Sequence, residues 1–127
     1  MSVSKRIVTM SRCHVFELAD IIGKKWTIVL LEEVSINGYR GFNALLKRMK
    51  KISPKILSQR LKQLEDAGII EKESFVYSNS LPKTRYRLTK KGEELHKIIA
   101  NLKEWSIKHS NEKLECGKIE CVKCDFY

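Results

Sequence analysis

A stretch of the chain between residues 40 and 63 holds eight basic side chains and no acidic one. The basic residues are Arg40, Lys47, Arg48, Lys50, Lys51, Lys55, Arg60 and Lys62. Apolar residues recur between them at the spacing of a helix, which predicts a folded stretch with one strongly positive side. These apolar residues are Phe42, Leu45, Leu46, Met49, Ile52, Leu57, Leu61 and Leu64. A folded, acid-free basic surface is typical of a protein that binds a polyanion, and nucleic acid is the commonest polyanion.

Four cysteines are the other residues that could do chemistry. Three of them have the spacing C-x4-C-x2-C, whose second half is usual in zinc and iron–sulfur sites: Cys116, Cys121 and Cys124. A closed zinc site needs a fourth ligand, for which the candidates are Cys13, His14 and His109. The three cysteines could instead form a disulfide switch or belong to a disordered tail. No cofactor is required, zinc is the one candidate, and these alternatives stay open.

The charge is unevenly distributed along the chain, whose net charge is +10. A second acid-free segment spans residues 83–92 and holds Lys83, Arg85, Arg87, Lys90 and Lys91. A lysine-rich surface that serves only thermal stability has Lys and Glu mixed along the whole chain. Here basic and acidic residues are separated, which favours a polyanionic partner. The length of 127 residues, with 43% apolar and 31% charged residues, suits one soluble globular domain. Because neither a membrane span nor a signal peptide is recognisable, we expect a cytoplasmic protein without membrane contact.

The elements that must position these residues follow from apolar spacing. Helices are predicted at residues 15–22, 24–34, 41–50 and 53–67, and from Thr89 to about His109. Strands at 69–77 and 84–88 are expected to form a β-hairpin around a loop at 78–83. Asn37-Gly38 indicates a turn, and Ser53-Pro54 is typical of a helix start. The order predicts a mainly α fold with a small β-hairpin (α+β), a winged helix-turn-helix.

The helix predicted at 53–67 would enter the major groove of DNA. Leu57, Leu61 and Leu64 fall within about 60° on a helical wheel and point to the core. The other side is polar and carries Lys55, Ser58, Gln59, Arg60, Lys62 and Gln63. Amides can pair with adenine edges, Arg with guanine, and Ser or Lys with bases or phosphates. An ordinary exposed helix would instead show Glu–Lys pairs four residues apart, and this face has no acid before Glu65.

The hairpin would be the wing, with Lys83 at its tip and Arg85 on one face. A cation at a wing tip can reach the minor groove, although such charges also protect the edge of a sheet. The free amides after Ser53-Pro54 can hold a phosphate. The expected DNA-binding residues are therefore Arg40, Lys51, Ser53, Pro54, Lys55, Ser58, Gln59, Arg60, Lys62, Gln63, Lys83 and Arg85.

Four segments together resemble a known family. They are Cys13 ahead of residues 20–27 (DIIGKKWT), residues 40–45 (RGFNAL), residues 52–70 (ISPKILSQRLKQLEDAGII) and residues 85–95 (RYRLTKKGEEL). The chain resembles the HxlR-type transcriptional regulators, a winged-helix family related to the MarR group, over roughly residues 13–109. Lys24 in place of a usual glycine and the additional Gly41 depart from the family's pattern.

The resemblance implies a homodimer on a palindromic or repeated operator, held together by the N- and C-terminal helices. The expected dimerisation residues are Val15, Leu18, Leu95, Ile99, Leu102 and Trp105, part of which could instead pack on the chain's own domain. The resemblance also implies a redox- or electrophile-sensing thiol at Cys13. A thiol at a helix N-terminus is generally reactive, and Lys5, Arg6 and Arg12 would add to this. The alternative is a buried, inert cysteine.

We therefore expect residues 1–112 to form a winged-helix DNA-binding domain and residues 113–127 a cysteine-containing tail. The hypothesis is a sequence-specific, homodimeric transcriptional regulator of double-stranded DNA without catalytic activity, responsive to thiol oxidation or metal. The alternative is a small metal- or redox-binding protein whose basic face is incidental. A thioredoxin-like enzyme is disfavoured because Cys121-Val122-Lys123-Cys124 does not follow a βαβ pattern.

Overall fold

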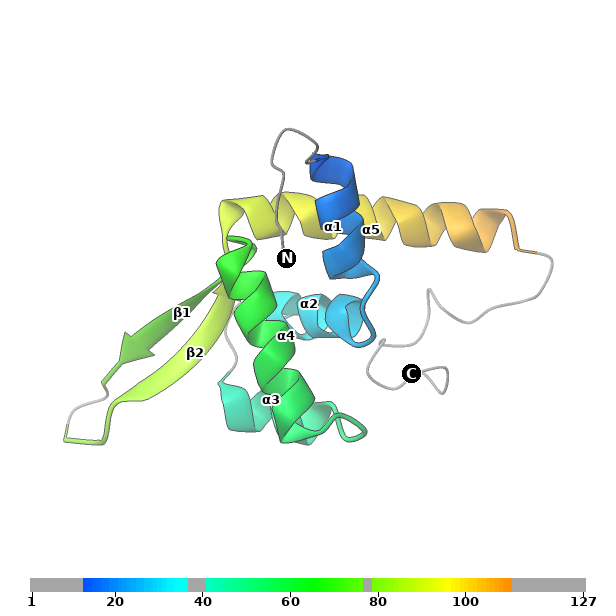
Figure 1. Ribbon diagram of the computed structural model, residues 1–127. Helices are drawn as coiled ribbons and strands as arrows, with labels where there is room; N and C mark the ends of the chain where they lie inside the picture. The colour runs from blue at the N-terminus through cyan, green and yellow to red at the C-terminus, as the bar shows by residue number, and fades with distance from the viewer. Residues whose placement is uncertain (1–12, 37–40, 77–78, 111–127) are drawn as a thin grey trace.

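The computed structural model describes residues 13–36, 41–76 and 79–110. The described residues form α1 (His14–Ile22), α2 (Thr27–Ile36), α3 (Phe42–Arg48), α4 (Pro54–Asp66), β1 (Ile70–Phe75), β2 (Lys83–Leu88) and α5 (Lys90–Lys108). Figure 1 shows α2 in the middle with α4 in front of it, the long α5 behind, and the hairpin projecting to the lower left. Three helices followed by a two-stranded antiparallel hairpin make a winged helix-turn-helix, so the predicted fold is confirmed.

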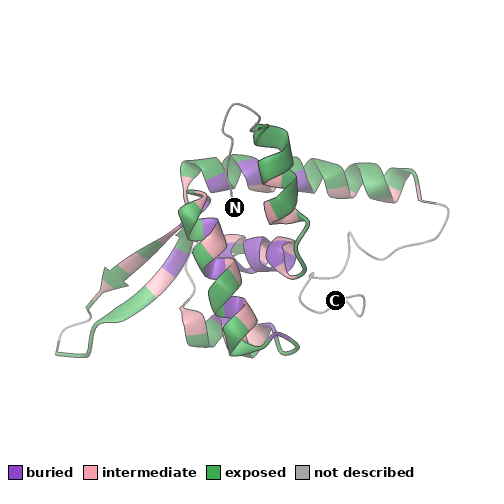
Figure 2. Cartoon of the chain, in the orientation of Figure 1, coloured by how far each residue is buried: buried purple, intermediate pink, exposed green. Residues whose placement is uncertain are grey.

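Helix α2 is the centre of the core, as its apolar pattern predicts. Val29, Leu30, Leu31 and Val34 are all fully or almost fully buried. The rest of the core comes from the other elements: Leu45, Met49, Ile52, Leu57, Leu61, Leu64, Ile69, Ile70, Tyr86, Leu95 and Ile99. Figure 2 shows this buried material on α2 and on the inner side of α4, while α1 is mostly exposed. No helix in the described ranges is long and apolar enough to cross a membrane.

The start of α2 differs from the prediction by three residues. The sequence pattern placed it at Lys24, but the helix begins at Thr27. Trp26 has a φ of 80°, in the left-handed region, which a residue inside a right-handed helix cannot adopt. The indole is partly buried against the core.

Helix α4 begins and ends where the sequence indicates. The Ser53 hydroxyl accepts a hydrogen bond from the Ile56 amide at 3.2 Å, and Pro54 is the first helical residue. After the last turn Gly68 has a φ of 74°, which glycine adopts without strain. The Ile69 amide then donates to the Leu64 carbonyl at 2.9 Å and turns the chain into β1.

The wing is tied to α5 at its base. The Thr89 hydroxyl accepts from the Gly92 amide at 3.1 Å and lies 2.6 Å from the Gly68 carbonyl, to which it can donate. A side chain at Gly92 would overlap the carbonyl of Ile69, so only glycine allows α5 to approach so closely. The Lys91 ammonium also donates to the Ala67 carbonyl at 2.7 Å, at the end of α4. The wing, α4 and α5 therefore share one junction.

Candidate nucleic-acid interface

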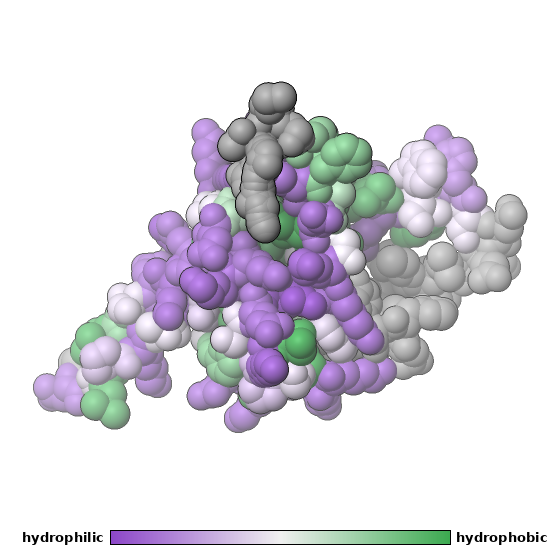
Figure 3. Space-filling view, in the orientation of Figure 1, coloured by the Kyte–Doolittle hydropathy of each residue, from purple (hydrophilic) through white to green (hydrophobic). Residues whose placement is uncertain are grey.

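The outward face of α4 is polar and open to solvent. Lys55, Ser58, Gln59 and Lys62 are exposed on it, whereas the helix's three leucines are no more than 2% exposed. Figure 3 shows mainly hydrophilic side chains over α4 on the face toward the viewer. The predicted division of this helix into a core side and a polar side is therefore confirmed.

The N-terminal end of α4 has the electrostatics of an anion site. Lys51, Ser53, Pro54 and Lys55 are exposed there, and the first turn carries no acidic residue. The positive end of the helix dipole points outward at such a terminus. Pro54 has no amide hydrogen and the amides of Ile56 and Leu57 donate to Ser53, which leaves the Lys55 amide for an anion. Arg40, predicted to bind phosphate nearby, lies outside the described residues.

Arg60 and Gln63 are engaged within the chain. The Arg60 Nε donates to the Lys25 carbonyl at 2.9 Å, and its Nη1 donates to the Gln63 Oε1 at 3.4 Å. Both side chains are half-buried. Their contacts hold α4 against the start of α2, and their predicted role in DNA binding stays a prediction.

The C-terminal end of the α4 face carries one ion pair of the kind an ordinary helix surface has. Lys62 lies 3.6 Å from Asp66, four residues on, and the two side chains are 76% and 67% exposed. Such an exposed pair contributes about 0.5 kcal/mol at most. Lys62 can therefore exchange Asp66 for a phosphate at little cost.

The basic face of the wing is matched by acids on the opposite strand. Antiparallel pairing sets Arg85 opposite Glu73 and Arg87 opposite Glu71. Arg85 lies 3.6 Å from Glu73 and 4.2 Å from the centre of the Phe75 ring, and Arg87 is bound to Glu71. Two of the five cations in the acid-free run are thus paired with acids in space, and the predicted DNA contact of Arg85 is not tested.

Lys83 differs from those two arginines. It is the first residue of β2 and is exposed. Leu81, two residues before it in the connection between the strands, is 83% exposed. The outer end of the wing therefore presents both a cation and an apolar side chain to solvent.

The predicted dimerisation stripe is divided between two environments. Leu95 and Ile99 are 6% and 2% exposed and belong to the chain's own core, because the body of the domain covers that side of α5. Their burial matches the alternative that part of the stripe packs on the chain's own domain, and their role in dimerisation stays a prediction. Leu18 is half-buried against the core. Val15, Leu102 and Trp105 are exposed, as the prediction requires.

Two exposed apolar residues were not among the predicted ones. Phe16 and Ile98 are 75% and 60% exposed. Ile98 lies one turn before Leu102 and two before Trp105, a spacing that could have revealed it. We call the exposed residues of these two helices the apolar face: Val15, Phe16, Ile98, Leu102 and Trp105.

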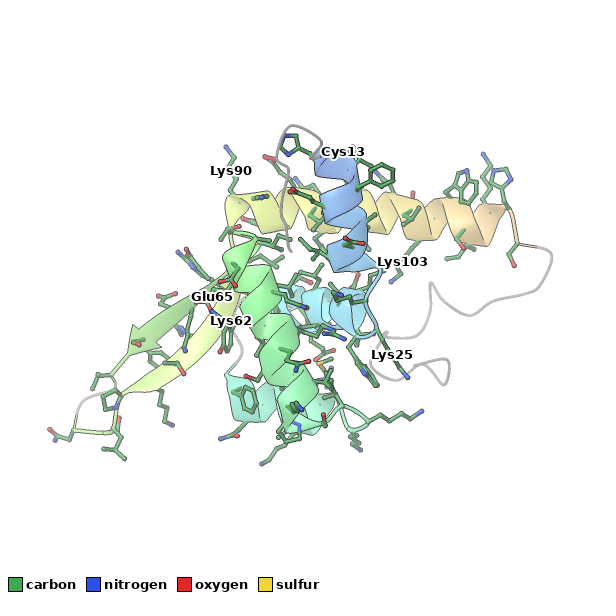
Figure 4. The ribbon with its side chains drawn as sticks, viewed as in Figure 1. Cys13, Lys25, Lys62, Glu65, Lys90 and Lys103 are labelled. Atoms are coloured by element: carbon green, nitrogen blue, oxygen red, sulfur yellow. The ribbon has the colours of Figure 1, made fainter. Side chains whose placement is uncertain are left out.

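Cys13 is exposed immediately before α1, at the N-cap position. The buried alternative for this thiol therefore does not describe the single chain. Figure 4 shows Cys13 at the end of α1 that is remote from α2. Lys5, Arg6 and Arg12, which would surround it, lie outside the described residues.

The predicted zinc ligands Cys116, Cys121 and Cys124 also lie outside the described residues, so that site stays a prediction. His109 ends α5 and is exposed, with its ring 5.2 Å from that of Trp105. Within the described part of the chain, no group of three His, Cys, Asp or Glu residues could hold a metal ion.

Comparison with known proteins places this arrangement in a family. Residues 21–114 match the model of the HxlR-like helix-turn-helix family. The uncharacterized HTH-type transcriptional regulator YdeP of Bacillus subtilis is 37% identical over 108 residues, which are 84% of this chain and 82% of YdeP.

Solved structures agree with the family match. The redox regulator HypR in its oxidized form has a TM-score of 0.64 and 31% identity, covering 79% of this chain and all of HypR. The reduced form of the regulator YodB from B. subtilis has a TM-score of 0.66 and 29% identity, covering 79% and 96%. The chain therefore belongs to the HxlR-like helix-turn-helix family of transcriptional regulators.

Proposed function

We propose that this protein is a homodimeric regulator that binds specific sequences of double-stranded DNA and responds to modification of Cys13. The observation that carries the proposal is the outward face of α4. Lys55, Ser58, Gln59 and Lys62 are exposed on a helix whose opposite side is anchored by buried leucines. A rigid helix that presents cations and an amide has the dimensions and chemistry of a major-groove reader.

The exposed groups divide into two roles. Lys55 is suited to phosphates through its ammonium and its backbone amide, and such contacts fix the position of the helix on DNA. Pro54 has no amide hydrogen, and the amides of Ile56 and Leu57 donate to Ser53. Gln59 is the exposed amide of the face, and an amide can pair with both polar edge atoms of adenine in the major groove. Gln63 is less suited because its carbonyl oxygen already accepts from Arg60. We therefore assign the reading of bases chiefly to Gln59, and the minor-groove contact of the wing to Lys83.

A second copy of the chain is the proposed cover for the apolar face. Five large apolar side chains at 50–75% exposure are costly to leave in water. Burying them between two copies would hold two α4 helices at a fixed distance. Two recognition helices about 34 Å apart fit successive major grooves, so the operator should contain two half-sites.

The position of Cys13 supports a response to thiol chemistry. The exposed thiol stands two residues before Val15, at the edge of the apolar face. The structural neighbour HypR is named a redox regulator and is described in an oxidized form. Modification of a thiol at that edge would change how two copies pack, and with it the spacing of the two α4 helices.

Selection from a random pool of double-stranded DNA tests the proposal. The protein should enrich a motif with two half-sites, and Gln59→Ala should lose discrimination at one position in each half-site. Glu104→Ala, at an exposed position of α5 roughly 100° from Trp105 on the helical wheel, is the control and should enrich the same motif as wild type. A pool that stays random after repeated rounds would contradict sequence-specific binding.

A further inference from the structure

The contacts of Arg60 set it apart from the other cations of α4. Its guanidinium donates to the Lys25 carbonyl, outside α4, at 2.9 Å and to the Gln63 side chain, on α4 itself, at 3.4 Å. Lys55 and Lys62 on the same helix are exposed, whereas Arg60 is half-buried. Figure 4 labels Lys25 in the connection between α1 and α2, to the right of α4.

The acceptor of Arg60 belongs to a well-defined junction. Thr27, the first residue of α2, is 1% exposed, and its amide donates to the Lys24 carbonyl at 3.2 Å. The Trp26 carbonyl accepts from the Leu30 amide at 2.8 Å and so starts the helix. Trp26 itself holds a left-handed φ of 80°, which persists only where the surroundings determine it. The Lys25 carbonyl is therefore fixed to the start of the core helix.

A directed bond adds something that the buried leucines of α4 do not. Apolar contacts are non-directional and tolerate small rotations of one element on another. A hydrogen bond weakens steeply when its angle is lost, and a guanidinium presents its donors in one plane. The bond from Arg60 to the Lys25 carbonyl therefore restricts the rotation of α4 about its own axis, which determines where its outward face points.

We propose that Arg60 is a positioning residue for DNA binding, which fixes the orientation of α4 relative to the start of α2 and contacts neither phosphate nor base. The inference rests on the proposed function, because the orientation of α4 matters only if α4 reads DNA. Arg60 is thereby removed from the set of phosphate contacts that the basic sequence suggests.

The salt dependence of binding separates positioning from contact. Affinity for duplex DNA is measured at several salt concentrations for wild type, Arg60→Met, Arg60→Lys and the contact control Lys55→Met. Arg60→Met should bind about tenfold more weakly, because orienting α4 then costs free energy on binding. Its log–log slope should equal that of wild type, since the same phosphates are bound. Lys55→Met loses one phosphate contact per subunit, so its log–log slope should be shallower than that of wild type by about 0.9 per subunit.

Arg60→Lys decides between charge and geometry. Lysine keeps the charge but lacks the planar donors, so it should bind as weakly as Arg60→Met, again with the wild-type slope. Wild-type affinity in Arg60→Lys together with a reduced slope in Arg60→Met would make Arg60 a phosphate contact and overturn the proposal. Wild-type affinity in both variants with only a lower melting temperature would show a purely stabilising role and overturn it equally.

Two further results have to be separated from a true loss of positioning: a variant that does not fold, and a wild-type protein that does not bind DNA. If Arg60→Met does not fold, Arg60→Gln, which also removes the charge, replaces it in the comparison of slopes. Weak binding at the wild-type slope supports positioning, and wild-type affinity overturns it. If wild type itself shows no salt-dependent binding, the proposed function fails, and with it the basis of the inference.

Discussion

Arg48 on α3 binds the buried carboxylate of Glu33 on α2 with two hydrogen bonds. The Nε lies 2.8 Å from one carboxylate oxygen and the Nη2 lies 3.3 Å from the other. The Glu33 side chain is 1% exposed and that of Arg48 is 34% exposed. Arg48 therefore joins the first two helices of the DNA-binding unit, and its charge is committed inside the protein although it lies in the acid-free basic stretch.

Replacing Arg48 should destabilise the fold more than its position on the surface suggests. Arg48→Met removes the guanidinium from a carboxylate that stays buried, and should lower the free energy of unfolding by about 2 kcal/mol. This loss is smaller than is usual for a fully buried ion pair because a third of the Arg48 side chain is exposed. The free energies of unfolding of wild type and variant are measured by urea denaturation. Lys47→Met, an exposed neighbour on α3, is the control and should stay within about 0.5 kcal/mol of wild type; equal losses in both would refute the pair's role.

Tyr86 should make stability fall at high pH. Burial, and secondarily the charge of Glu65, raise the pKa of this phenol above its ordinary value of 10.0. The folded state therefore keeps its proton where the unfolded state loses it. This contribution is fully present below the ordinary pKa and is lost as pH rises through the raised one. Unfolding free energies from pH 8 to 11.5 should fall more steeply above about pH 10 for wild type than for Tyr86→Phe. Parallel curves would contradict the prediction.

Local patterns in the sequence predicted α4 and the wing because the determinants are local. The Ser53-Pro54 start and the leucine spacing act within one helix. The partners of Arg48, Arg60 and Arg85 could not be predicted, because each lies on another element: Glu33, the Lys25 carbonyl, and Glu73 with Phe75. Charge counted along the chain therefore overestimates the positive surface.

Two other differences between the predicted and the observed structure also depend on how separate elements pack together. The left-handed Trp26 stands in the stretch after Gly23 that the apolar pattern predicts as helix from Lys24, since no glycine or proline lies between Lys24 and Thr27. The apolar stripe of α5 is visible in the sequence. Which part of it faces the core depends on how the domain packs, and this buries Leu95 and Ile99 but leaves Ile98 exposed.

A carboxylate in the apolar face should dissociate the proposed dimer. Trp105→Glu places a charge where a second copy would bury the indole, and the cost of desolvating it should weaken self-association at least about a hundredfold. Ala100→Glu adds the same group at an exposed position roughly 140° away on α5 and should remain dimeric. Light scattering gives the mass of each. A monomeric wild type, or equal masses in both variants, would rule out this interface.

Oxidation should alter DNA affinity through Cys13. Diamide takes one hydrogen from each of two thiols as they join in a disulfide, here Cys13 with a second copy's Cys13 or with an added small thiol. The affinity should change by about fivefold or more. Cys13→Ser should abolish the response, while a variant with serine at Cys116, Cys121 and Cys124 should keep it. The opposite pattern would assign the response to the tail cysteines.

The most direct test of the account is the affinity of the reduced protein for duplex DNA as a function of salt concentration. Two α4 helices with basic N-terminal ends, and two wings with Lys83, should contact several phosphates. The logarithm of the binding constant should then fall linearly with the logarithm of salt concentration, with a slope of about −4 or steeper. A slope near zero, or no binding at low salt, would contradict the claim that this surface binds DNA.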